Sequence, residues 1–186
     1  MSTVLLVVDM QHGAFDGVRC PTIAHAERLL ARHAELIAAA RAAAMPVVFV
    51  QHCDDESGSP FETDTPHGLI HPMLAPNPGE AMVRKRESDA FDNTELAATL
   101  TRLAADTLVI CGLQSEYCVT ATTEAALERQ FRVLLVGDGH GTWPGEEQSA
   151  DAISAEVNRK LAARGAQVRS SSELTASWRE AAAQAV

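Results

Sequence analysis

The apolar run Thr107-Leu108-Val109-Ile110-Cys111 leads directly into Gly112-Leu113-Gln114-Ser115-Glu116-Tyr117-Cys118-Val119-Thr120. The run is typical of a buried strand, Gly112 of a tight turn, and the segment from Thr122 to Glu128 of a helix. A strand, a turn and a helix in this order form the repeating unit of a parallel sheet with helices packed on its faces. We therefore expect strands and helices to alternate along the chain.

Cys118 falls in the first turn of the predicted helix. A thiol there lies among unpaired backbone N–H groups at the positive end of the helix dipole, which favours the thiolate. Cys118 is therefore a candidate nucleophile. The alternative is that Cys118 is a small buried residue that packs the helix against the sheet, and this stretch alone does not decide between the two.

The other segments show the expected alternation. The sequence predicts strands at 3–8, 47–51, 81–83, 107–111, 132–136 and 166–169, and helices at 22–44, 93–104, 116–129 and 149–164, the first capped by Thr22. This pattern predicts one α/β domain over residues 1–186 with a mainly parallel sheet. Residues 52–78, rich in Gly, Pro, Ser and Asp, form a long loop of the kind that is usually functional. The alanine-rich tail, 175–186, is helical, packs on a neighbouring subunit, or frays.

Composition excludes several classes of partner and site. The formal net charge is −10 and the fifteen basic residues are scattered, which argues against nucleic acid and anionic membranes as partners. The first residues resemble no signal peptide and no apolar run approaches the ~20 residues of a membrane span, so we expect a cytoplasmic protein. None of the four cysteines forms a CxxC pair, and reduced thiols are expected. We interpret three of them as structural: Cys20, Cys53 and Cys111.

Chemically capable side chains follow several strands. Asp9 ends the first strand, His52 the second and Asp138 the fifth, while Cys118 follows the fourth. Ligand sites in such sheets lie beyond the carboxyl ends of the strands, where the strand order reverses, so these groups should gather at one edge. The alternative is that strands of any soluble domain end in polar residues.

Hydrolysis of an amide by a thiol needs a base, a cation and donors for the oxyanion. Asp9 is the candidate base and Cys118 the nucleophile. On spacing alone, Arg84, Lys85 and Arg86 are equally eligible as the cation, and a solvated basic cluster is the alternative.

Three segments, within a match from Val4 to about Val168, resemble the isochorismatase-like cysteine hydrolases. The opening LLVVDMQHGAF, from Leu5 to Phe15, is similar to the family's strand that ends in Asp and is followed by Gln and Phe. The segment 85–91, with Thr94 and Leu96 after it, resembles the lysine loop, and its register selects Lys85 over the neighbouring arginines. Residues 112–119, with Thr122 and Ala125, resemble the nucleophile turn. Asp89 departs from the small residue usual before Ala90 and Phe91, which could loosen the lysine loop.

The resemblance implies a catalytic triad of Asp9, Lys85 and Cys118. It implies a three-layer α/β/α fold with a doubly wound six-stranded sheet in the order 3-2-1-4-5-6. It also implies a cis peptide between Leu113 and Gln114 that aims the N–H groups of Gln114 and Cys118 at one oxyanion.

The implied activity is hydrolysis of a C–N bond, of amide or carbamoyl and ureido type, in a small molecule. The reaction would pass through a thioester acyl-enzyme and use no cofactor. The isochorismatases proper lack a cysteine at the nucleophile turn, so Cys118 argues against vinyl-ether hydrolysis. The family also implies a homodimer or homotetramer. The residues expected to line the substrate pocket reach the same edge of the sheet: Phe15, His52, Gln114, Tyr117, His140 and Trp143. For Phe15 and Trp143, packing is an equal alternative.

Two other functions stay open. The chain could be a non-catalytic oligomeric scaffold or thiol sensor, although a scaffold needs neither Asp9 nor Lys85. A nicotinamidase-like amidase would hold a metal after the second strand, where this chain lacks the Asp-x-His pattern. Four nearby side chains are candidate ligands, although loop histidines are more often solvated, and we expect no metal: His52, Asp54, His67 and His71. A nucleotide-binding oxidoreductase is disfavoured because no GxGxxG turn follows the first strand.

Overall fold

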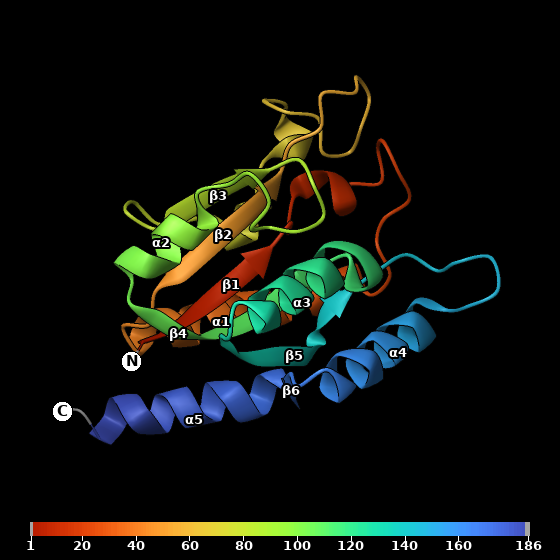
Figure 1. The fold of residues 1–186 in the computed structure, drawn as a ribbon. Helices are drawn as coiled ribbons and strands as arrows, with labels where there is room; N and C mark the ends of the chain where they lie inside the picture. Colours follow the sequence, from red (N-terminus) through yellow and green to blue (C-terminus); the bar gives the residue numbers. More distant parts are fainter. Residues whose placement is uncertain (1, 185–186) are drawn as a thin grey trace.

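The computed structural model describes residues 2–184, in which strands and helices alternate (Figure 1). The strands are β1 (Ser2–Val8), β2 (Val47–His52), β3 (Ala81–Lys85), β4 (Ala105–Leu113), β5 (Arg132–Gly141) and β6 (Gln167–Arg169). The helices are α1 (Ala26–Ala42), α2 (Leu96–Arg102), α3 (Thr120–Glu128), α4 (Ala150–Ala163) and α5 (Ser171–Gln184). The connection between β2 and β3, predicted as a loop, contains two short 3-10 turns, Pro66–Gly68 and Pro72–Leu74.

The six strands form one sheet in the order β3-β2-β1-β4-β5-β6, and every pair is parallel. The predicted strand order is confirmed. The order reverses between β1 and β4, whose carboxyl ends lie side by side with Val8 opposite Gly112. This places the end of β1 and the turn after β4 at the same edge of the sheet, where ligands bind in such folds.

Helices cover both faces of the sheet (Figure 1). The β1 residues alternate between two apolar cores, and Val4 to Val8 are 0% exposed, as expected of a central strand buried on both faces. One core contains the apolar side chains of α1 and α5, and the other contains those of α2, α3 and α4. The three-layer architecture is therefore confirmed.

Several helices and strands begin or end at residues other than those predicted. Helix α1 begins at Ala26 after His25, which has a positive φ of 56°, so the predicted cap at Thr22 is wrong. Strand β5 continues to Gly141 because its end pairs with β4, with His140 opposite Gly112. The tail forms α5, whose buried Leu174 and Trp178 join the core under α1. Residues 185–186 of the predicted tail lie outside the described residues.

Among residues 2–184, the structure has no helix that combines the length and the apolar character needed to cross a membrane.

Candidate active site

Asp9 follows β1 at the point where the strand order reverses. Its backbone has a positive φ of 51°, and its N–H donates to the carbonyl of Val50 at 2.9 Å. The residue is 2% exposed, and its Oδ2 lies 2.8 Å from Nζ of Lys85. Within residues 2–184, Oδ1 of Asp9 has no hydrogen-bond partner. The carboxylate therefore has one oxygen held by the lysine and one oxygen free to accept a proton.

Lys85 ends β3 and is also 2% exposed. Besides Asp9, its ammonium donates to Sγ of Cys118 at 3.1 Å and to the carbonyl of Glu87 at 3.0 Å. Nδ1 of His52 is a fourth neighbour at 3.3 Å. An ammonium has three hydrogens, so these four acceptors share them. The predicted base, cation and nucleophile thus meet at one buried ammonium.

The charges of these groups shift one another's pKa values. Burial alone would lower the pKa of Lys85, but the charges of Asp9 and Cys118 outweigh it, and the pKa is raised. Burial, followed by the charge of Asp9, raises the pKa of the Cys118 thiol to about 11, although Lys85 opposes this shift. At neutral pH the geometry therefore favours a protonated thiol beside an ion pair. The expectation that the helix dipole stabilises a thiolate is wrong, because burial and the nearby carboxylate dominate.

Cys118 lies in a π-helical turn, Ser115–Val119, which connects β4 to α3. It therefore precedes α3 rather than lying in its first regular turn. Such π-helical turns are rare and often occur at functional sites. The Cys118 side chain is partly buried and packs against the core under α3.

The chain enters this turn through a tightly constrained segment. Gly112 has a φ of +129°, and a Cβ at this position would lie 1.9 Å from the carbonyl oxygen of Val8. Only glycine fits both this conformation and this approach. The peptide bond between Leu113 and Gln114 is cis.

Among the predicted pocket residues in the described chain, His52 is the one with a hydrogen bond to Lys85. One of its ring nitrogens lies within 4.8 Å of both Sγ of Cys118 and a carboxylate oxygen of Asp9. Burial, and then the charge of Lys85, lower the pKa of His52, so its ring is neutral at neutral pH. The backbone of His52 is held by Gln11, whose side chain accepts from its N–H at 2.8 Å and donates to its carbonyl at 2.8 Å. We did not predict this role for Gln11, although the residue is part of the motif quoted above.

His140 hydrogen-bonds to the turn that carries Cys118, and its predicted contact with substrate stays a prediction. It is 5% exposed, and its Nε2 lies 3.0 Å from Oδ1 of Asn158, whose amide group donates to the carbonyl of Gly137. These bonds assign the ring hydrogen to Nε2, so Nδ1 accepts from Oγ of Ser115 at 2.8 Å. Ser115 in turn accepts from Oγ of Ser154 at 3.0 Å. Neither Ser115 nor Asn158 carries a sequence signal for this role.

The other predicted pocket residues have different surroundings. The Phe15 ring packs edge-on against His71 with centroids 5.2 Å apart, and Nε1 of Trp143 donates to the carbonyl of Pro21. Tyr117 is 57% exposed. Within the described chain, none of these three side chains forms a hydrogen bond with Asp9, Lys85 or Cys118. Their contact with substrate stays a prediction, and so does that of Gln114.

The four candidate metal ligands do not come together. His67 hydrogen-bonds to Asp16, and the ring of His71 packs against His12 and Phe15. Among residues 2–184, one set of three side chains has ligand atoms that all lie within 4.8 Å of one another: Asp9, His52 and Cys118. The Lys85 ammonium hydrogen-bonds to all three, so a cation already occupies their common neighbourhood.

Asp89, which we expected could loosen the lysine loop, forms a hydrogen bond within it. Its Oδ1 accepts from the N–H of Phe91 at 2.8 Å, and the N–H of Ala90 donates to Oγ1 of Thr122 on α3 at 3.1 Å. The aspartate therefore closes its own turn, and the following residue anchors the loop to the helix after the nucleophile turn.

Residues 3–173 match the sequence profile of the isochorismatase domain. Two streptothricin hydrolases of Streptomyces noursei are 37% identical over 160 and 163 residues, which is 85% of this chain in each case. The matches cover 62% and 57% of those proteins, so the chain spans about 60% of the length of these curated relatives. An N-carbamoylsarcosine amidase from Arthrobacter is 32% identical over 114 residues, covering 52% of this chain and 43% of that protein.

Solved structures have the same fold. An isochorismatase from Pseudomonas putida KT2440 is 28% identical with a TM-score of 0.84, and the match covers 92% of this chain and 89% of that one. A cysteine hydrolase from Pseudomonas syringae superimposes with a TM-score of 0.88 over 96% of this chain and 93% of that one. Its sequence identity is 22%, so this likeness concerns the fold alone.

Proposed function

The chain belongs to the isochorismatase family, and on this premise we propose that it hydrolyses a C–N bond of a small molecule through a covalent thioester on Cys118. The bond is of the amide, carbamoyl or ureido type. In this proposal Cys118 is the nucleophile, Asp9 the proton acceptor and donor, and Lys85 the cation that holds both in place. No cofactor takes part.

One observation carries the proposal: the buried ammonium of Lys85 is within hydrogen-bond distance of both Asp9, at 2.8 Å, and Sγ of Cys118, at 3.1 Å. Burying a lysine and an aspartate is costly unless they are paired and hydrogen-bonded. A packing scaffold gains nothing from placing this pair against a thiol, whereas a hydrolase needs a base and a nucleophile held together. This argues against the scaffold and thiol-sensor alternative.

The raised pKa of the Cys118 thiol, about 11, decides how the reaction begins. The thiol keeps its proton in the resting enzyme, so deprotonation and attack are coupled. The unpartnered Oδ1 of Asp9 takes the proton from Sγ while Sγ bonds to the carbonyl carbon of the substrate. The electron pair of the C=O bond moves to oxygen and forms a tetrahedral oxyanion.

Breakdown of this intermediate releases the first product. The carbonyl bond re-forms, the C–N bond breaks, and Asp9 returns its proton to the departing amine. This leaves a thioester on Cys118 and a carboxylate on Asp9. Water then attacks the thioester carbon as Asp9 takes a proton from it, and collapse of the second tetrahedral intermediate expels Sγ, which takes that proton back. The products are an amine and a carboxylic acid, and the thiol is regenerated.

The oxyanion donors in this proposal are the backbone N–H groups of Gln114 and Cys118. Both belong to the constrained segment between Gly112 and α3, where the cis peptide precedes the π-helical turn. Fixed donors of this kind stabilise the charge that develops on the carbonyl oxygen and need no reorganisation during the reaction.

The relatives supply the first compounds to test. Two of them are streptothricin hydrolases and one is an N-carbamoylsarcosine amidase. We would assay release of amine or ammonia from streptothricin, N-carbamoylsarcosine and simple primary amides. Purified parent protein would be compared with Cys118→Ala, Cys118→Ser and Asp9→Asn, and Cys53→Ala would serve as a matched control because Cys53 is also a free thiol and has no role in the proposed reaction.

We expect turnover of at least one compound by the parent and by Cys53→Ala, and a loss of at least about a thousandfold in both Cys118 variants and in Asp9→Asn. Normal turnover by Cys118→Ala would overturn the proposal. Size-exclusion chromatography with light scattering on the same preparations tests the expected homodimer or homotetramer.

A further inference from the structure

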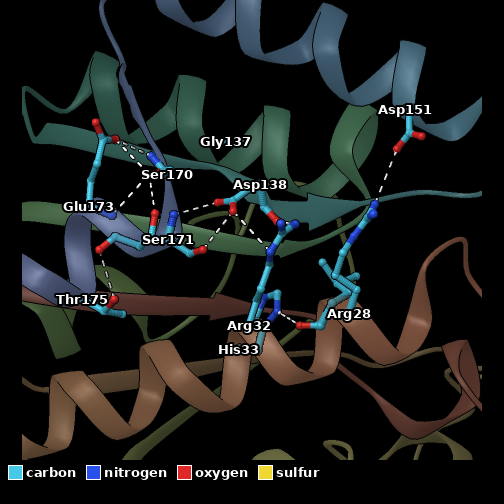
Figure 2. A network of polar contacts seen from close by, with 12 residues as sticks. Arg28, Arg32, His33, Gly137, Asp138, Asp151, Ser170, Ser171, Glu173 and Thr175 are labelled. Atoms are coloured by element: carbon cyan, nitrogen blue, oxygen red, sulfur yellow. Dashed lines mark hydrogen bonds and ion pairs between the residues drawn. The ribbon is translucent and has the colours of Figure 1, made fainter.

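A cavity of about 230 Å³ lies away from Cys118, between α1, the carboxyl end of β5 and the first turns of α4. Two arginines one helical turn apart on α1, Arg28 and Arg32, line it together with Asp138 and Asp151. Figure 2 shows these four side chains, with both arginines extending from α1 toward β5 and α4. None of these residues belongs to the site around Cys118.

The deeper acidic group is already fully engaged. Oδ1 of Asp138 accepts from the N–H of Ser171 at 2.7 Å, and its Oδ2 accepts from Oγ of Ser171 at 2.9 Å (Figure 2). The same Oδ2 lies 3.2 Å from Nε of Arg32, and Nη1 of Arg32 donates to the backbone carbonyl of Asp138 at 2.8 Å. Asp138 therefore fastens α5 to β5 and orients Arg32. The terminal nitrogens of Arg32 still have hydrogens to donate.

The guanidinium of Arg28 is weakly engaged. Among the described residues, its acidic neighbour is Asp151, at 3.9 Å, a distance too long for a hydrogen bond. Asp151 is 72% exposed and lies 3.0 Å from Nε2 of His25. Arg28 thus presents donors to the cavity, and the carboxylate beside it stands at the rim, where it can move away.

The backbone adds positive potential at the same place. The cavity lining includes His25, which precedes α1, and Ala150, the first residue of α4. These helices contain 17 and 14 residues, and the N-terminal end of a helix carries a partial positive charge. The N-terminal ends of α1 and α4 and the two guanidinium groups would therefore all favour a negatively charged ligand.

The hydroxyl and imidazole hydrogens in the lining of the cavity are already donated to protein groups. Nε2 of His140 is bonded to Asn158, and Ser154 donates to Ser115. Oγ1 of Thr142 donates to Glu116 at 2.8 Å. The free donors with positive charge in the cavity are therefore on its arginines, and the ligand that matches them is an acceptor with negative charge.

We propose that this cavity binds a small oxyanion, a carboxylate or phosphate group, between Arg28 and Arg32, in competition with Asp151. Guanidinium groups bind both oxyanions through paired N–H donors. Ser154 and His140 line the cavity, and both hydrogen-bond to Ser115 in the turn that carries Cys118. These two residues therefore connect a bound anion to that turn.

Calorimetric titration of the full chain with inorganic phosphate, and separately with acetate, tests the proposal and separates the two sources of the anion. Arg28→Gln should weaken binding by about tenfold or more, because a charge-assisted hydrogen bond is lost. Asp151→Asn should tighten binding, because the competing carboxylate is gone. Arg159→Gln, at a 76% exposed arginine elsewhere on α4, should leave the affinity unchanged.

Three results would overturn the proposal: no binding of either anion at millimolar concentration, equal affinity in the parent and Arg28→Gln, or weaker binding by Asp151→Asn. Backbone amide NMR locates the anion independently of these variants. We expect phosphate to shift the signals of Gly141, Ala150 and Ser154, and to reach Ser115 through its bond with Ser154. Shifts confined to the residues around Lys85 would place the anion in the other site and refute the assignment.

Discussion

Replacing Asp9 by asparagine should have opposite effects on the two properties of Cys118. Hydrolysis should be lost, because no base remains. The reaction of Cys118 with iodoacetamide at neutral pH should become faster, because the charge of Asp9 raises the pKa of the thiol and the charge of Lys85 lowers it. A variant that activates the thiol toward a small reagent while abolishing turnover would separate the base from the nucleophile.

The size of the effect follows from the geometry. A carboxylate oxygen of Asp9 lies within 4.8 Å of Sγ. At an effective dielectric constant of about 20, two unit charges at that distance interact by about 3 kcal/mol, which corresponds to about two pKa units. The pKa of the thiol would fall from about 11 to about 9, and the thiolate fraction at pH 7 would rise about a hundredfold. Because a less basic thiolate is less nucleophilic, the alkylation rate should rise about tenfold.

The assay is the pH dependence of iodoacetamide labelling at Cys118, followed by peptide mass spectrometry from pH 6 upward. In the parent, labelling should keep rising beyond pH 10, whereas in Asp9→Asn it should level off about two units earlier. Asp16→Asn is a matched control, because Asp16 is another largely buried carboxylate but pairs with His67. Slower labelling of Asp9→Asn than of the parent would refute the reasoning.

Three further substitutions test other parts of the structure. Lys85→Met should slow labelling of Cys118 and destabilise the fold by about 3–5 kcal/mol in urea denaturation, because it leaves the Asp9 carboxylate buried without a partner; unchanged stability would contradict the buried pair. Gly112→Ala should destabilise the protein by more than about 3 kcal/mol, because the new Cβ would lie 1.9 Å from the carbonyl oxygen of Val8. Gly58→Ala is the matched control: Gly58 also has a positive φ, +89°, but no atom lies within 4 Å of a Cβ there, so the substitution should cost only about 1 kcal/mol. Equal losses would show that backbone conformation alone matters. His33 is fully buried, and burial lowers its pKa from 6.5 to about 4. Between these two pH values the side chain is protonated in the unfolded chain and neutral in the folded chain. Stability should therefore fall as the pH drops from about 6.5 to about 4, by about 3 kcal/mol from this residue, and His33→Met should lose that dependence in chemical denaturation; an identical pH profile would contradict the assignment.

The fold could be predicted from the sequence where local patterns match tertiary burial. The continuous apolar run before Asp9 indicates a strand buried on both faces, and β1 has that position at the centre of the sheet. The end of β5 carries no such signal, because residues 137–141 alternate glycine with Asp and His. Its pairing with β4 depends on a partner distant in the sequence. The family resemblance supplied the strand order, which local patterns do not contain.

The site was predictable in its residues but not in its electrostatics. Strand ends singled out Asp9 and the strand, turn and helix order singled out Cys118, whereas the choice of Lys85 over Arg84 and Arg86 came from the family resemblance. The pKa of Cys118 depends on burial and on a carboxylate from another strand, so a rule based on the local helix dipole gave the wrong direction. His140 was assigned to the pocket because it follows the fifth strand. The bonds of its two ring nitrogens to Ser115 and Asn158 appear only in three dimensions.

The most direct test of the central claim is acid-quenched mass spectrometry of the protein during turnover of a compound that it hydrolyses. A thioester mechanism predicts an acyl group on the peptide that contains Cys118. Hydroxylamine should release this group, as expected of a thioester, and Cys118→Ala should neither carry it nor turn over the compound. Continued turnover by Cys118→Ala, or an acyl group on a different residue, would contradict this mechanism.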